Sequence, residues 1–87
     1  MFQRIYINRR AVQAESRAMF DRSLRHADHI RRFSISSNGT SGWEVRREDD
    51  LALTRHDVYQ DWHRVERALA LFEREVSELR EQGWRDS

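Results

Sequence analysis

The feature that most constrains this chain is an apolar stripe near its C-terminal end. Between Asp61 and Gln82 the apolar residues recur at alternating spacings of three and four positions, the period of an α-helix with one buried face. Asp61 suits the cap before the helix, and Gly83 suits the left-handed position after it, with Trp84 folding back on the last turn. The sequence therefore predicts an amphipathic helix over 61–82. The stripe consists of Trp62, Val65, Leu69, Phe72, Val76 and Leu79.

Upstream of this helix, three short segments have the composition of β-strands and are separated by turn residues. The five-residue loop at 38–42 opposes Ile35 to Val45 and Ser37 to Trp43. A three-residue turn at 48–50, with Asp50 in the left-handed conformation, opposes Val45 to Leu53 and gathers the apolar residues on one face. The predicted strands are 33–37, 43–47 and 51–58; the predicted inner face is Phe33, Ile35, Trp43, Val45, Leu51 and Leu53, and the outer face is Ser34, Ser36, Glu44, Arg46, Ala52 and Thr54.

The first third of the chain reads as a second helix. It contains neither proline nor glycine before Gly39, and its apolar and small residues follow helical spacing, which predicts a helix over about 9–31. Residues 1–8 either continue this helix or form a short strand. The predicted fold is one α+β domain over 1–87: a helix, a three-stranded antiparallel sheet, and a long C-terminal helix packed on one face of the sheet. The positions that carry the helical spacing are Val12, Ser16, Met19, Ser23, Ala27 and Ile30.

Length and composition exclude several classes of protein. The chain has 87 residues and no cysteine, which excludes disulfides, thiolate zinc sites and thiol nucleophiles. No apolar run approaches the roughly 18 residues of a membrane span. The N-terminal sequence lacks the apolar core of a signal peptide, so we expect a cytoplasmic location. A chain of this size builds only one modest core, and a partner chain can complete it.

The charges are divided unevenly along the chain. All 16 basic residues are arginine. Residues 1–47 hold 10 arginines and 4 acidic residues, whereas residues 48–87 hold 6 arginines and 11 acidic residues. Two such halves can neutralise each other within the molecule or a dimer, or the basic half can bind nucleic acid through phosphate contacts. For the second alternative, the contact residues on the first predicted helix are Arg10, Arg17 and Arg25.

No constellation of residues specifies a catalytic, cofactor or metal site. His26 and His29 lie one helical turn apart, a spacing that holds a divalent metal only when a third ligand such as His63 arrives. The serines lack a nucleophile elbow, and the three glycines match no phosphate-binding loop. We therefore assign no catalytic residue, metal ligand or cofactor and expect no enzyme. Trp43 and Trp62 can serve as stacking platforms or as core, and the parity of their neighbours favours core.

Two resemblances accompany this interpretation. The order helix, three strands, helix over residues 9–83 resembles the double-stranded RNA-binding domain in topology, but the start of the last helix lacks the lysine cluster of that family. The run Tyr59-Gln60-Asp61-Trp62-His63-Arg64-Val65-Glu66-Arg67-Ala68, followed by Gly83-Trp84, resembles short uncharacterised bacterial proteins. This second resemblance implies a stand-alone bacterial domain and no particular site.

The long apolar stripe and the small size together favour a non-catalytic module that associates with a second copy of itself, as a homodimer, or with another protein. The alternative is a nucleic-acid-binding or regulatory domain that uses the arginines of the first predicted helix.

Overall fold

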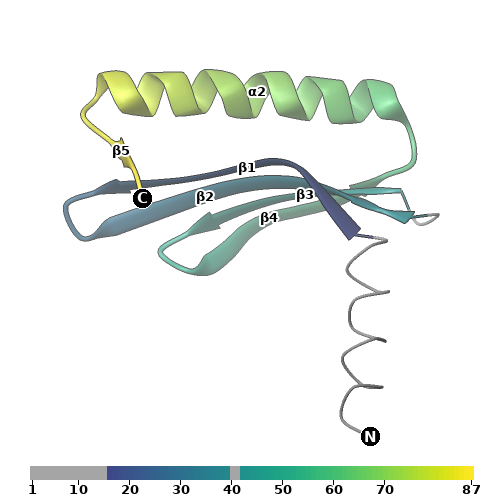
Figure 1. Ribbon diagram of the computed structural model, residues 1–87, viewed down its shortest axis with the longest axis horizontal. Helices are drawn as coiled ribbons and strands as arrows, with labels where there is room; N and C mark the ends of the chain where they lie inside the picture. The colour runs from purple at the N-terminus through teal and green to yellow at the C-terminus, as the bar shows by residue number, and fades with distance from the viewer. Residues whose placement is uncertain (1–15, 40–41) are drawn as a thin grey trace, which may run out of the picture.

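The fold rests on a meander of antiparallel strands (Figure 1). The computed structural model describes residues 16–39 and 42–87. Across the sheet the order is β4-β3-β2-β1-β5, so each long strand lies beside the one that follows it in the chain. The elements are β1 (Ser16–His26), β2 (His29–Asn38), β3 (Trp43–Asp49), β4 (Ala52–Tyr59), α2 (Trp62–Glu81) and β5 (Arg85–Asp86).

Helix α2 lies along one face of the sheet and buries the core against it (Figure 1). The ring of Phe72 packs on those of Phe20 and Phe33, with centroids 6.3 and 5.0 Å apart. The side chains that reach this core come from β1, β2 and β3 and from every third or fourth position of α2, as the stripe predicts. The buried residues are Phe20, Leu24, Phe33, Ile35, Val45, Val65, Ala68, Phe72, Val76 and Leu79.

The helix expected at 9–31 is wrong for residues 16–31, which form β1, a tight turn and the start of β2; residues 9–15 lie outside the described part. Phe20 and Leu24 point to the core from alternate positions of a strand. The turn places Ala27 in the left-handed conformation, with a φ of 54°, which is unfavourable for alanine. The helical spacing gives the wrong prediction for two reasons. The exposed surface of the sheet on which α2 packs tolerates small and polar residues, and tertiary packing overrides weak local preferences. The described sheet therefore has five strands instead of three.

The register between β2 and β3 confirms the prediction: Ile35 faces Val45 and Ser37 faces Trp43. Between β3 and β4 the prediction is wrong, since Val45 faces Asp57 and Leu53 faces Glu48. The turn there has two residues, Asp50 and Leu51, both with positive φ.

As a consequence, the inner face of β4 differs from the expected one. Leu51 is 82% exposed at the turn and Leu53 is 50% exposed, so neither belongs to the core. Thr54 sits at an irregularity of the ladder and donates its hydroxyl to the carbonyl of Arg47 at 3.1 Å. Because the bulge inserts one extra residue, the side chains of β4 after residue 54 point to the opposite faces from those that simple alternation in the sequence predicts. Ala52, expected to face outward, is exposed beside the turn.

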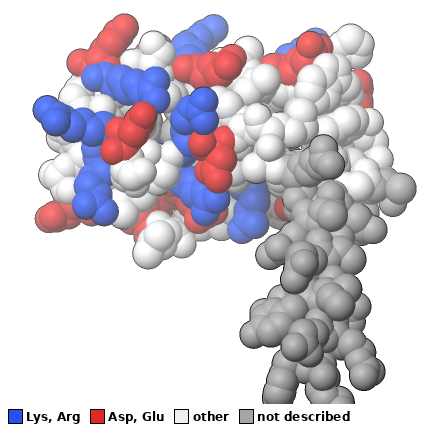
Figure 2. Space-filling model, viewed as in Figure 1, with Lys and Arg blue, Asp and Glu red and all other residues white. Residues whose placement is uncertain are grey.

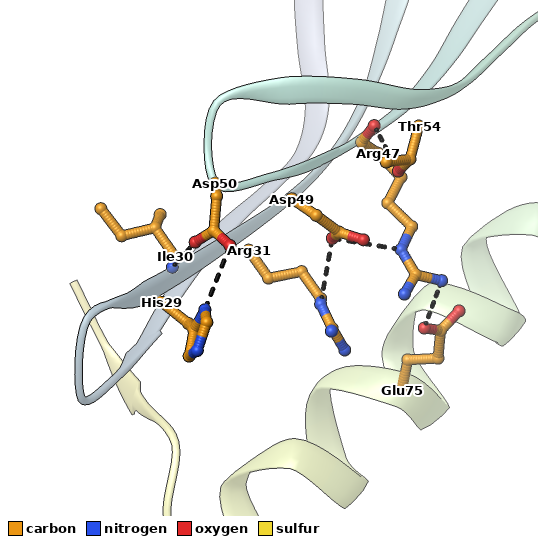
Figure 3. Close-up of polar contacts among 8 residues, drawn as sticks. All are labelled: His29, Ile30, Arg31, Arg47, Asp49, Asp50, Thr54 and Glu75. Carbon is orange, nitrogen blue, oxygen red and sulfur yellow. Dashed lines mark hydrogen bonds and ion pairs between the residues drawn. The ribbon is translucent and has the colours of Figure 1, made fainter.

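A polar clasp explains why Asp50 adopts the left-handed conformation that the sequence predicts (Figure 3). Its carboxylate accepts a hydrogen bond from the backbone N–H of Ile30 at 2.9 Å and contacts the ring of His29 at 3.1 Å. The bond from Ile30, followed by that from His29, lowers the pKa of Asp50 below its ordinary value. The clasp ties the β3–β4 turn to the β1–β2 turn and fixes the turn geometry.

An ion-pair chain extends from the sheet to the helix (Figure 3). Arg31 contacts Asp49 at 3.0 Å, and Arg47 reaches both Asp49 at 3.5 Å and Glu75 of α2 at 3.0 Å. These partners are about one-third exposed, so their role is mainly to set the position of α2 over the sheet.

Both ends of α2 confirm the sequence signals. The Asp61 side chain accepts a hydrogen bond from the N–H of His63 at 3.0 Å. At the other end, the N–H of Trp84 bonds to the carbonyl of Leu79 at 2.9 Å while Gly83 has a φ of 101°, which is a Schellman cap. In the described part of the chain, no helix is both long and apolar enough to cross a membrane.

The sequence predicts that Trp43 and Trp62, which begin β3 and α2, both belong to the core, and the structure confirms this only for Trp43. Trp43 packs against the core as expected, whereas Trp62 remains 39% exposed. Their rings meet at 5.5 Å in a tilted arrangement. Trp62 is the first residue of α2 and thus lies beside Trp43 at the border of the core.

Candidate functional site

Strand β4 contributes less to the core than the other long strands, mainly through the half-buried Tyr59 that packs against it. It is the last strand on one side of the sheet, and none of the buried core residues belongs to it. Among the described residues, no strand pairs with its outer edge. A strand of eight residues with a free edge offers a row of backbone donors and acceptors to a further strand.

The side chains of β4 after the bulge alternate between two surfaces. Arg55, Asp57 and Tyr59 lie on the side of α2, and the guanidinium of Arg55 lies 5.7 Å from the centre of the Phe72 ring. His56 and Val58 lie on the open side, opposite Arg46 and Glu44 of β3. The helix side of β4 is therefore polar, and the open side carries the half-exposed Val58.

A shallow groove of about 370 Å³ runs between β4 and the first turns of α2. Arg55 runs along its β4 side, since its Nε donates to Asp57 at 2.7 Å and an Nη donates to the Tyr59 hydroxyl at 3.3 Å. The hydrogen bond to Asp57 is the main reason why the pKa of Arg55 is raised. The groove combines cationic and apolar side chains: Arg55, Tyr59, Arg64, Arg67, Ala68 and Leu71.

Elsewhere in the described part, several arginines pair with neighbouring carboxylates. Arg32 forms two hydrogen bonds with Asp21 at 3.0 and 2.9 Å, which raise its pKa. Arg80 binds Asp86 in the same way. On the face shown in Figure 2, blue and red side chains alternate without one large region of a single sign. Among the ion pairs of arginine, those of Arg31 with Asp49 and of Arg47 with Asp49 and Glu75 join the basic first half of the chain to the acidic second half, so these contacts cancel part of the uneven charge.

The three arginines proposed for nucleic-acid contact are not arranged as expected. Arg10 lies outside the described residues. Arg17 and Arg25 both belong to β1, where eight strand positions separate them by about 26 Å. In the register, Arg25 faces Ile30 on one side and Arg85 on the other. The helical stripe that would have aligned these arginines is therefore replaced by a strand.

The histidines considered for a metal site are spread over the molecule. The ring of His26 stacks on Trp84 at 5.5 Å, and His29 contacts Asp50. His63 lies at the start of α2, 3.7 Å from Glu66. Within residues 16–39 and 42–87, no group of three or more histidine or acidic side chains is placed to hold a metal ion.

Sequence reasoning missed the groove. The spacing of apolar residues gives no functional role to Arg55, Tyr59, Arg64 or Arg67. One signal was available: the first turn of α2 contains no acidic residue but does contain Arg64, the reverse of the preference set by the helix dipole.

Comparison of the chain with models of known protein families, with curated proteins and with solved structures gives no match.

Proposed function

We propose that this chain is a protein-interaction module that forms a homodimer through the free edge of β4. The observation that carries the proposal is that β4 is an eight-residue strand at the edge of the sheet that adds no fully buried side chain to the core, to which it contributes the half-buried Tyr59. An edge strand of this kind is better explained if it pairs with a strand of a second copy than if it only shields the core.

The side chains of β4 suit antiparallel pairing about a twofold axis at His56. In this register Arg55 of one copy lies opposite the partner's Asp57, and the reverse pair follows by symmetry. Directly opposed residues in an antiparallel pair have their Cβ atoms about 5 Å apart, which allows ion pairing between them. Most other registers place these charges beside neutral side chains, so the pair favours this arrangement over nonspecific edge pairing.

The same arrangement covers apolar surface. Val58 and Leu53 are each 50% exposed on the open side of the sheet, and pairing at His56 brings Val58 of one copy next to the partner's Leu53. Antiparallel pairing of the two β4 strands about this twofold axis joins the two sheets into one continuous sheet. Both α2 helices then lie on the same face of that sheet. Because only one strand and its flanks are buried, we expect an interface at the small end of the stable range and a Kd of about micromolar order.

The oligomeric state tests this proposal. Sedimentation velocity over a wide range of protein concentration should show a reversible monomer–dimer equilibrium. Val58→Lys places a charge in the interface and should give a monomer, because lysine on an edge strand opposes pairing. Met19→Lys is the matched control: it also replaces an exposed apolar residue, 45% exposed on β1, and should leave the equilibrium unchanged.

A charge swap tests the register. Arg55→Asp and Asp57→Arg should each weaken association by about tenfold, since each variant replaces two symmetric attractive pairs by repulsive ones. The double variant restores opposite charges within and between copies and should recover the wild-type Kd, with circular dichroism confirming the fold. A wild-type chain that stays monomeric at the highest concentration contradicts the proposal. So does equal weakening by Val58→Lys and Met19→Lys.

A further inference from the structure

The groove between β4 and α2 has the size and composition of a small-ligand site. Its volume of about 370 Å³ falls in the range of roughly 300–1,000 Å³ that such sites occupy. The Tyr59 ring, Ala68 and the half-exposed Leu71 give it apolar surface, whereas three guanidinium groups give it hydrogen-bond donors. This combination suits a ligand that is anionic at one end and apolar at the other.

The charges in the groove are unbalanced. Of the three arginines, only Arg55 has a carboxylate partner, Asp57 at 2.7 Å. Arg64 lies over the Tyr59 ring at 6.0 Å, and among the described residues neither it nor Arg67 forms an ion pair. The lining therefore has a net charge of about +2 when Asp57 is counted, because arginine stays protonated at every physiological pH.

The position of these arginines on α2 makes the imbalance more pronounced. Arg64 lies in the first turn and Arg67 in the second, and the first turn holds no acidic residue. The N-terminal end of a helix is its positive end, so cations there are less stable than anions. The carboxylate of Asp61 at the N-cap offsets part of this cost, and an anion bound between Arg64 and Arg67 would offset more of it.

We propose that this groove binds a small organic phosphate, with the phosphate group held by Arg64 and Arg67 and the apolar part resting on Tyr59 and Leu71. A phosphate monoester is a dianion near neutral pH and matches the net charge of the lining. Guanidinium groups bind phosphate oxygens through paired hydrogen bonds. The site lies within one chain, so it goes beyond the proposed homodimer and does not require it.

Calorimetric titration at low ionic strength tests the proposal with three probes: inorganic phosphate, phenyl phosphate and benzoate. Phenyl phosphate should bind with one site per chain and about tenfold more tightly than inorganic phosphate, because the ring adds apolar contact. Benzoate, a monoanion with the same ring, should bind more weakly than phenyl phosphate. Equal affinity for benzoate and phenyl phosphate, or no binding of phenyl phosphate, overturns the proposal.

Variants then locate the site. Arg64→Gln and Arg67→Gln should each weaken phenyl phosphate binding by about tenfold, the effect of losing one charge-assisted contact. Arg74→Gln removes the same charge from an exposed position of α2 outside the groove and should change the affinity less than about twofold. If Arg74→Gln weakens binding as much as the groove variants do, binding reflects net charge alone and the site is wrong.

One more variant separates this proposal from the homodimer. Val58→Lys, which should not dimerise, should bind phenyl phosphate with the wild-type affinity per chain, since Val58 lies on the opposite face of β4. Binding that disappears in Val58→Lys, while its circular dichroism is unchanged, overturns the assignment of the site to one chain without refuting self-association. A monomeric wild type that binds phenyl phosphate leaves the site intact and refutes only the dimer.

Discussion

Neighbouring residues of α2 should differ sharply in their contribution to stability. Phe72 is fully buried and contacts the rings of Phe20 and Phe33, whereas Leu71 is 46% exposed. Phe72→Ala should lower the free energy of unfolding by about 3–5 kcal/mol, because it removes buried apolar surface and leaves a cavity. Leu71→Ala should cost about 1 kcal/mol, since only half of its side chain leaves water on folding.

Urea titration followed by circular dichroism measures the difference. A domain of this size has a total stability of about 5–10 kcal/mol, so the Phe72→Ala midpoint should fall by about 3–5 M urea if the slope is about 1 kcal/mol per molar. The Leu71→Ala midpoint should fall by no more than about 1 M on the same slope. If Phe72→Ala does not fold, Phe72→Leu should still cost more than Leu71→Ala. Equal losses for the two positions would refute the placement of α2 on the sheet.

Three further changes test local features of the fold. Asp61→Ala should cost about 1 kcal/mol in thermal unfolding, because it removes the acceptor for the N–H of His63. The lowered pKa of Asp50 means that its charge stabilises the fold above the ordinary carboxyl pKa, so wild type should lose its stability advantage over Asp50→Asn as the pH falls from about 5 to about 3. Asp50→Asn keeps an acceptor for Ile30 and thus isolates the charge; a pH-independent difference contradicts this. Leu51→Asn should stabilise by about 0.5–1 kcal/mol, since Leu51 is exposed with a φ of 70° that asparagine tolerates better; a lower melting temperature speaks against this.

The candidate site could be anticipated only in part. The free edge of β4 depends on the order of strands across the sheet, and the bulge at Thr54 decides which side chains face α2. Neither follows from periodicity, because a one-residue shift exchanges the two faces of a strand. The reversed charge preference in the first turn of α2 was visible in the sequence, but its meaning depends on Arg55 and Tyr59 being close by.

The sequence by itself determined the elements whose signals are local. The stripe, Asp61 and Gly83 specify α2 and both of its ends, and the loop at 38–42 specifies the pairing of β2 with β3. These features depend on side chains within a few positions of one another and on backbone conformations that few residues adopt.

Only the tertiary structure decided the remaining features. Residues 16–31 carry a helical spacing, yet they form strands because pairing with β2 and burial of Phe20 and Leu24 under α2 stabilise a wider sheet. The turn at Asp50 is set by a contact with Ile30, 20 residues away. Such contacts are formed between segments that the chain brings together only on folding, so short-range patterns do not contain them.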